Sequence, residues 1–390
     1  MRHQPQNYWL TWAASLLFFV GFFSLLVPLP LYLGQIGLPD WQISVILGAF
    51  GVASLVGRPL SGLAADRIGY RATMLIGVSA LLVGVGGLSL TTNPAILFLL
   101  RLLQALGYVA FTTASNALVV ALAAPEERKS LLTRFGAAAN VAMTLTPATI
   151  NWLLPLLKLQ GALWVSICFA LVCGGLAFRI QMPAALNEAK AFAWRRLRLP
   201  RTILLPMVLA ALAGVGFGSF LQFLPLLTER QGALPSGPFF ALYGATIALT
   251  RFAVARWVDR GDQRLILRGG YGLLTLGLAL FAGGSTWPWF ALAVSCVAAG
   301  SGLLTGLLMN LHVEALPPAA RGSAVACYYL GFDLGIGGGG LVFAALFERW
   351  GVAALFGCAA VVTAAGIVLV QFVARGAEAP ELEPASAATR

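Results

Sequence analysis

Four ionisable side chains stand well inside long apolar stretches of this sequence: Asp333, Arg58, Arg101 and Arg251. A charge at such depth in a bilayer is costly, so it should face a cavity, a partner or the interior of a helical bundle. Asp333 is the only carboxylate so placed. A carboxyl group that meets each side of a membrane in turn can carry a proton, so we expect Asp333 to exchange a proton or contact a substrate. A hydrogen-bonded packing role stays open for it.

The three arginines each allow two interpretations. Arg101 lies roughly 10 Å into its apolar run at 1.5 Å per residue, where it can tune a substrate or proton path or simply bind backbone carbonyls. Arg58 and Arg251 lie about two turns from the ends of their runs, so they can also snorkel towards the headgroups. Three such arginines against one aspartate favour an anion in a shared cavity.

Neutral polar residues on the same runs complete the candidate cavity, and they are Gln104, Asn116, Asn140 and Asn310. Asn140 occupies the position that matches Asp333 when the second half of the chain is laid on the first. His312 and Glu314 stand near the end of a later run, where they can simply face the cytoplasm.

Other kinds of chemistry lack their residues here. The sequence has no nucleophile–base pair, no metal-ligand spacing and no phosphate-binding glycine loop, so we expect neither an enzyme nor a cofactor. Its five cysteines all lie in apolar stretches without redox or metal spacing. Without a Walker sequence, any uphill transport must draw on an ion gradient unless a separate subunit supplies ATP hydrolysis.

Composition points to a membrane protein built only of helices. Of 390 residues, 59% are hydrophobic and 10% are charged, and the mean hydropathy is +0.87. Apolar runs of about twenty residues recur along the chain, and helices satisfy their own backbone hydrogen bonds in lipid. We expect twelve spans: 9–33, 42–65, 72–91, 95–123, 131–157, 161–179, 202–228, 238–258, 266–284, 288–314, 323–347 and 352–374.

The basic residues indicate topology rather than nucleic-acid binding, although the net charge is +11. With the N-terminus inside, the cytoplasmic segments hold 19 Lys and Arg residues and the outer loops hold three. This asymmetry places both termini in the cytoplasm. We expect a multi-pass protein of a bacterial inner membrane, with a disordered tail over 376–390.

The chain is an internal repeat. Asp66 and Arg67 recur as Asp259 and Arg260, displaced by 193 positions, and other charges and prolines follow the same offset. Two halves in the same orientation imply a pseudo-two-fold axis along the membrane normal, with the substrate path at their seam. We therefore predict six-helix bundles over 1–180 and 202–375, joined by a cytoplasmic linker at 181–201.

Two segments resemble the major facilitator superfamily. The loop after the second span, GLAADRIGYR, is similar to that family's signature at Gly62, Asp66, Arg67, Gly69 and Arg71. RLLQALG is similar to its second motif at Arg101, Gln104 and Gly107. The resemblance implies a twelve-helix transporter that works by alternating access.

Two other segments bear on the branch within that family. The family's antiporter motif ends in Gly-Pro, whereas this chain has Thr146-Pro147, which weakens an export assignment from that motif. YYLGFDLGIGGGG in span eleven resembles the drug and sugar efflux branch, which includes arabinose efflux permeases.

The signature charges suggest a latch at the cytoplasmic side. Asp66 can face the N-terminus of span eleven, where the helix dipole favours an anion. Arg67 and Arg71 can pair with Glu126 or Glu127 in the next cytoplasmic loop, and Asp259 and Arg260 are the matching gating candidates in the second half. A few kcal/mol would bias an alternating-access equilibrium. These residues can equally be ordinary solvated loop charges.

The leading interpretation is a monomeric, proton-coupled exporter of small apolar or amphipathic compounds. An importer or uniporter of a small, anionic metabolite is the alternative. A receptor or lipid scramblase on the same fold is a third hypothesis from a different class. The expected partners are a small-molecule substrate, protons and the lipid bilayer, with no nucleic acid.

Overall fold

The computed structural model describes residues 5–122, 128–181, 201–230, 235–258, 262–316 and 321–373. These ranges are helical apart from short turns, and no strand occurs in them. The helices are α1 (Pro5–Phe23), α2 (Pro28–Gln35), α3 (Asp40–Ile68), α4 (Tyr70–Leu88), α5 (Pro94–Leu122), α6 (Arg128–Arg179), α7 (Leu204–Arg230), α8 (Gly237–Val258), α9 (Gln263–Gly283), α10 (Trp287–Glu314), α11 (Arg321–Val342) and α12 (Ala344–Leu369).

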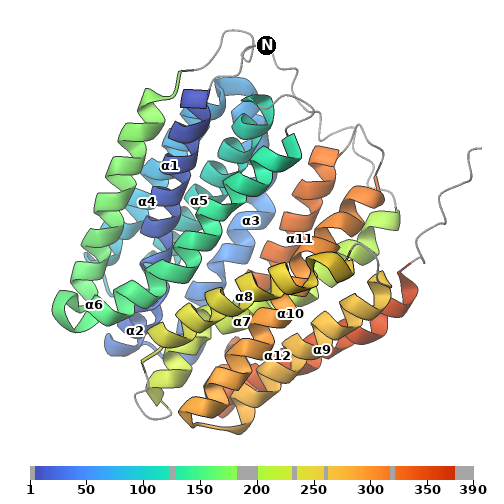
Figure 1. Ribbon diagram of the computed structural model, residues 1–390. Coiled ribbons are helices and arrows are strands. Elements are labelled where there is room, and N and C mark those ends of the chain that lie inside the picture. Colours follow the sequence, from blue (N-terminus) through green and yellow to red (C-terminus); the bar gives the residue numbers. More distant parts are fainter. Residues whose placement is uncertain are drawn as a thin grey trace, which may run out of the picture.

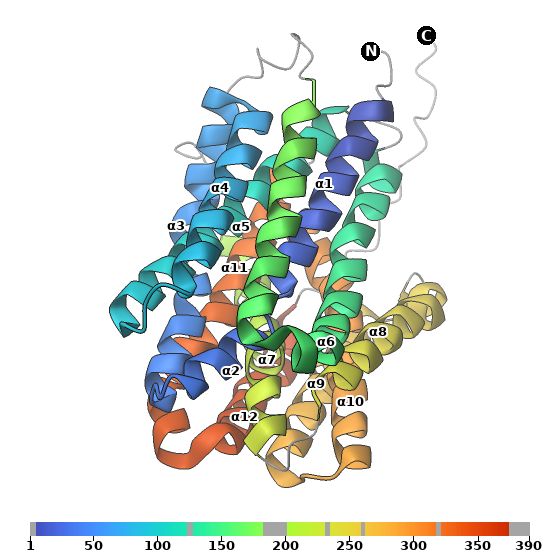
Figure 2. The ribbon, with the colours of Figure 1, turned by 90° about the vertical axis from the view of Figure 1, so that its left-hand side faces the viewer.

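The all-helical membrane fold is confirmed. Nine helices within the described ranges are long and apolar enough to cross a bilayer. At 1.5 Å per residue, the 29 residues of α3 extend about 44 Å, beyond the roughly 30 Å of hydrocarbon. The fifth and sixth predicted spans form one 52-residue element, α6, with a left-handed φ of 54° at Lys158. Figure 2 shows α6 as two arms joined at a bend.

Two predicted spans differ from the structure in detail. The span 9–33 is interrupted, since α1 ends at Phe23 and α2 begins at Pro28. Proline has no N–H, and its ring clashes with the carbonyl four residues earlier, so Pro28 stops α1 yet suits the first turn of α2. The span 323–347 already ends at Val342, and a short first part of α12 follows before Gly351, whose φ is 77°.

Matching glycines bring neighbouring helices together in both halves. A Cβ on Gly107 of α5 would lie 2.6 Å from the Gly77 carbonyl oxygen of α4. In the second half, a Cβ on Gly300 of α10 would lie 2.6 Å from the Gly270 carbonyl oxygen of α9. Both glycines are displaced by the 193 positions of the sequence repeat, so the repeat extends to backbone packing.

The two ends of the sequence form two sets of helices, which we call the first group (α1–α6) and the second group (α7–α12). Figure 1 shows the blue-to-green first group on one side of the molecule and the yellow-to-red second group on the other. The groups touch mainly through α3 against α11 and α6 against α8. Most of the predicted linker, 182–200, lies outside the described residues.

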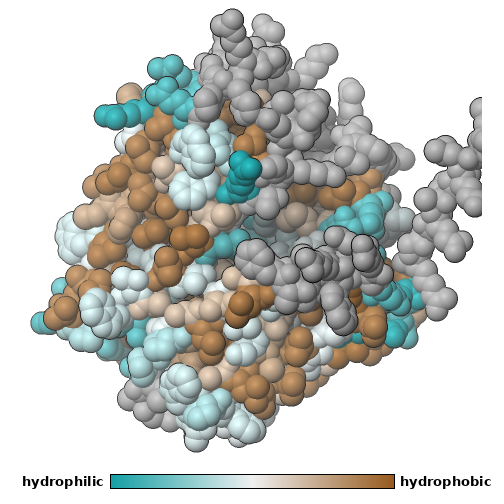
Figure 3. Space-filling model, in the orientation of Figure 1, coloured by the Kyte–Doolittle hydropathy of each residue, from teal (hydrophilic) through white to brown (hydrophobic). Residues whose placement is uncertain are grey.

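Large apolar side chains cover the outside of the bundle. Figure 3 shows brown, hydrophobic residues spread over much of one face. Trp152, Leu156 and Trp164 of α6 are each about two-thirds or more exposed. Apolar surface of this extent is unusual on a water-soluble monomer and suits contact with lipid chains.

Candidate functional site

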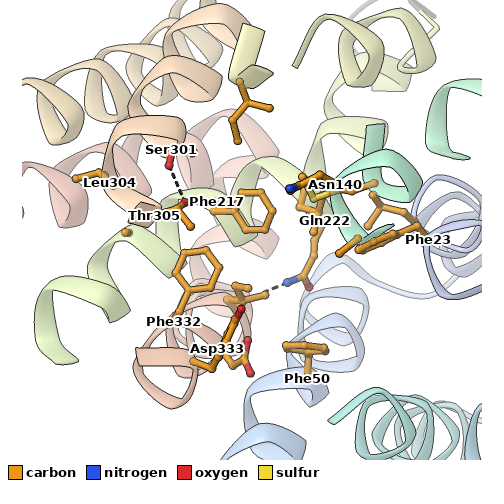
Figure 4. Close-up of a pocket in the computed structure, with 18 of the residues that line it drawn as sticks. Phe23, Phe50, Asn140, Phe217, Gln222, Ser301, Leu304, Thr305, Phe332 and Asp333 are labelled. Carbon is orange, nitrogen blue, oxygen red and sulfur yellow. Dashed lines mark hydrogen bonds between the residues drawn. The ribbon is translucent and has the colours of Figure 1, made fainter. Parts of the chain in front are cut away.

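A cavity of about 210 Å³ lies between the two groups of helices, with walls from α1, α3, α5, α6 and from α7 to α11. Aromatic side chains make up about a third of the lining residues in the described ranges, and Figure 4 labels Phe23, Phe50, Phe217 and Phe332 among them. The aromatic members are Phe22, Phe23, Phe50, Tyr108, Phe217, Tyr243, Tyr328, Tyr329 and Phe332. A largely apolar, concave site with few polar groups is the usual form of a small-molecule site.

Asp333 lines this cavity and is bound by two side chains of α3. The Arg58 Nε donates to Asp333 Oδ2 at 2.9 Å, and the Arg58 Nη2 makes a second contact with the same oxygen. Ser54 Oγ donates to that oxygen at 2.6 Å. All three residues are buried. This ion pair joins the first group of helices to the second, about 275 positions apart in the chain.

The pairing corrects the interpretation of both charges. Arg58 does not snorkel towards the headgroups; its guanidinium is buried against Asp333 and lies 5.0 Å from the centroid of the Tyr329 ring. Asp333 is therefore not an isolated acid. The helices approach closely enough because glycines meet nearby: a Cβ on Gly51 of α3 would lie 2.8 Å from the Gly337 Cα of α11.

Arg101 also lines the cavity, from α5. It is 6% exposed, and its Nη1 donates to Gln104 Oε1 at 3.1 Å. Its guanidinium carbon lies 5.5 Å from the centroid of the Phe22 ring. The Nε has no hydrogen-bond partner in the described part of the chain. Among the described residues, Arg101 is thus a buried cation whose one side-chain hydrogen bond goes to a neutral amide.

The other predicted cavity residues divide into two sets. Asn140 of α6 lines the cavity, whereas Gln104 reaches it only by supporting Arg101. Asn116 and Asn310 lie elsewhere: Asn116 donates to the Thr112 carbonyl at 2.7 Å, and Asn310 is exposed and donates to Glu314 at 2.6 Å.

His312 also differs from expectation, because it is fully buried and does not face water. Its Nδ1 is 2.7 Å from the Leu308 carbonyl oxygen, and its ring packs edge-on against the cavity residue Tyr328. Sequence reasoning also missed Gln222 of α7, which lines the cavity and donates from Nε2 to the Ile336 carbonyl at 3.1 Å. An amide inside an apolar run was the signal that could have identified it.

The signature loop lies at the end of α3, away from the cavity. Asp66 and Arg67 belong to the last turn of α3, as Gly62 does to the turn before, and Gly69 turns the chain into α4 with a φ of 89°, which favours glycine. Arg71 lies 4.5 Å from the centroid of the Phe178 ring of α6. The other latch candidates, which are Glu126, Glu127, Asp259 and Arg260, lie outside the described residues, so the latch remains a prediction.

The opposite end of the bundle holds two further contacts between the groups. Arg230, the last residue of α7, donates to Asp40, the first residue of α3, at 2.7 Å. Ser236 donates to Asn151 of α6 at 3.2 Å. Together with the buried pair at Asp333, these bonds connect the groups from the cavity to this end.

Comparison with known proteins agrees with this architecture. The sequence family described as the Major Facilitator Superfamily matches residues 11–336, most of the chain. The chain belongs to the major facilitator superfamily. It is accordingly a multi-pass membrane transporter and not an enzyme.

Individual superfamily members differ in what they carry. A chloramphenicol resistance protein of Pseudomonas aeruginosa is 27% identical over 289 residues, which cover 70% of this chain and 67% of that protein. Among solved structures, a mutant of the nucleoside transporter NupG has a TM-score of 0.78 at 13% identity, covering 94% of this chain and 99% of that one. A D-xylose–proton symporter has a TM-score of 0.76 at 16% identity, covering 96% and 99%. At these identities the structures share the fold alone with this superfamily member.

Proposed function

We propose that this transporter exports small apolar or amphipathic compounds from a bacterial cell in exchange for protons. The observation that carries the proposal is the buried Arg58–Asp333 pair, in which Asp333 lines the cavity and Arg58 ties it to the other group of helices. A protonated Asp333 no longer attracts Arg58 electrostatically. Proton binding can therefore weaken the contact between α3 and α11, the contact that must open and close during alternating access.

The energetics of such a pair suit a conformational switch. Removing one charge of a buried ion pair costs about 3–5 kcal/mol of folding free energy, because the other charge stays buried without a counter-charge. A shift of about 5.5 kcal/mol moves an equilibrium from 1:99 to 99:1. The free-energy change on protonating one such carboxylate is therefore large enough to change which side of the cavity is open.

The proposed orientation places both termini in the cytoplasm, as the basic residues indicate. Asp40, Arg230 and Ser236 then lie at the extracytoplasmic end, and their bonds support an inward-facing arrangement with that end held closed. A bacterial inner membrane is the proposed location, in keeping with the bacterial relatives.

Export is favoured by one relative and by the cavity walls. The relative in Pseudomonas aeruginosa is named for chloramphenicol resistance, and an aromatic cavity suits amphipathic compounds. Import is the second candidate, since one of the similar folds is a proton symporter for D-xylose. The direction of coupling distinguishes the two.

Reconstitution into liposomes tests the proposal. Uptake of small amphipathic compounds, chloramphenicol included, is measured with the liposome interior acidic, neutral or alkaline relative to the medium. Exchange for protons predicts accumulation with an acidic interior only, abolished by nigericin and absent from protein-free liposomes. Accumulation with an alkaline interior would make the protein a symporter, and equal uptake under all three conditions would make it a uniporter.

A further inference from the structure

Arg101 has a feature that proton coupling at Asp333 leaves unexplained. Its guanidinium is buried at the cavity wall, yet its Nε has no acceptor in the described part of the chain. A structural arginine would place its donors on backbone carbonyls, but the bond that holds Arg101 goes to the Gln104 amide. A buried cation without a counter-charge is costly, so this arrangement suits a site completed by a ligand.

The charges around the cavity leave Arg101 uncompensated. Asp333 is the only carboxylate among the residues that line the cavity in the described ranges, and Arg58 and Ser54 already bind it. The remaining polar lining residues in the described ranges are uncharged; they are the four tyrosines named above together with Asn140, Gln222, Ser301 and Thr305. Because the Arg58–Asp333 pair is neutral as a whole, Arg101 leaves one net positive charge at the cavity, which is complementary to a monoanion.

The rest of the wall defines the other part of the ligand. The Phe22 ring lies beside the Arg101 guanidinium, and Phe217 and Phe332 contribute further ring surface, with centroids 5.5 Å apart. Figure 4 places Ser301 and Thr305 on one side of this space and Asn140 and Gln222 on the other. Ser301 Oγ and Gln222 Oε1 are buried without a partner in the described residues, so each can meet a polar substituent.

We infer that Arg101 is an anion subsite and that the transported compound is a small aromatic monoanion, with its carboxylate on Arg101 and its ring among the phenylalanines. This inference deepens the proposed function, because it takes the same cavity as the transport site. Among amphipathic compounds in general, it selects those that carry a single negative charge. A charge-assisted bond to a buried arginine should favour a carboxylate over its uncharged amide by about tenfold or more.

Matched ligands test the inference by binding alone. The probes are benzoate with benzamide, salicylate with salicylamide, and 2-naphthoate with 2-naphthamide, each titrated calorimetrically into purified protein without any gradient. We expect the carboxylate of at least one pair to bind about tenfold more tightly than its amide. Arg101→Gln should abolish that preference while leaving amide affinity unchanged, and Arg101→Lys should restore part of it.

Each other outcome overturns the inference. Equal affinity for acid and amide, or no binding of any carboxylate, would remove the anion subsite. A preference that persists in Arg101→Gln would assign the charge recognition to another residue. An equal loss of acid and amide binding would give Arg101 a purely structural role.

The two proposals fail separately. A carboxylate preference that depends on Arg101, together with uptake that ignores the pH gradient, would refute proton exchange alone. Gradient-driven uptake of neutral compounds without any such preference would refute the anion subsite alone.

Discussion

Neutralising either member of the Arg58–Asp333 pair should destabilise the protein strongly, and neutralising both should cost less. The two side chains are 10% and 5% exposed, so water can solvate neither charge once its partner is lost. Arg58→Gln leaves a buried carboxylate that keeps the Ser54 hydrogen bond but loses its counter-charge. Loss of one partner from such a pair costs about 3–5 kcal/mol.

The double variant Arg58→Gln with Asp333→Asn leaves two neutral amides in place of the two charges. Replacing both members of a buried ion pair is often nearly neutral, so its unfolding free energy should exceed that of either single variant. Because the double variant should cost less than either single variant, the interaction energy from the four proteins should be at least about 3–5 kcal/mol in magnitude. Unfolding in mixed micelles with increasing sodium dodecyl sulfate, followed by tryptophan fluorescence, measures all four values.

The ion pair between Arg230 and Asp40 supplies the matched control. It also joins the two groups of helices, but its side chains are 40% and 19% exposed. Solvated pairs contribute about 0–1 kcal/mol, so the same cycle there should be close to additive. If the Arg58 and Asp333 substitutions were also additive, with single costs below about 0.5 kcal/mol, the buried contact would not exist in the folded protein.

Three further experiments address topology and gating. In a cysteine-free background, Gln35→Cys should react with an impermeant thiol reagent outside intact cells and Gln181→Cys should not; the reverse pattern would invert the topology. Asp66→Asn should fold normally but lose most uptake into proteoliposomes, whereas parental uptake would make Asp66 an ordinary loop charge. Asp40→Asn removes an extracytoplasmic bond, so external labelling of a cavity cysteine at position Asn140 should rise severalfold, and unchanged labelling would exclude a gating role.

The spans were predictable because each is a local property of the chain. An apolar run of about twenty residues must cross the bilayer as a helix, and basic residues mark the loops on one side. The proline at position 28 also accounts for the break between α1 and α2, although the continuous apolar run led to a prediction of one span over 9–33. The glycines at the helix crossings recur at the 193-position offset of the charges and prolines, but that they form close contacts is seen only in the structure.

The buried ion pair was not predictable from local pattern. Arg58 lies near enough to a helix end to snorkel, and nothing within α3 identifies a partner in α11. Their pairing depends on which helix faces meet, and that is fixed by the approach of Gly51 to Gly337. The sequence identified the deep acid and the deep base separately, but only the packing of α3 against α11 joins them.

The position of Asn310, one of the two asparagines that lie away from the cavity, has a simpler explanation. Ser301, Leu304, Thr305 and Leu308 of α10 line the cavity at intervals of three and four residues, as one helical stripe does. Asn310 follows Leu308 by two positions, roughly 200° around the helix, and so points away. Asn310 was predicted to line the cavity without regard to this periodicity. A helical projection of α10 would have excluded it.

The claim that protons drive transport through Asp333 can be tested by one comparison. Parental protein and Asp333→Asn are reconstituted into liposomes with an acidic interior, and both uphill accumulation and downhill exchange of a bound substrate are recorded. Asparagine keeps the volume of the side chain but cannot release a proton. The account predicts that the variant loses accumulation and retains downhill exchange. Accumulation at the parental level in Asp333→Asn would contradict it and would leave Asp333 as a packing residue.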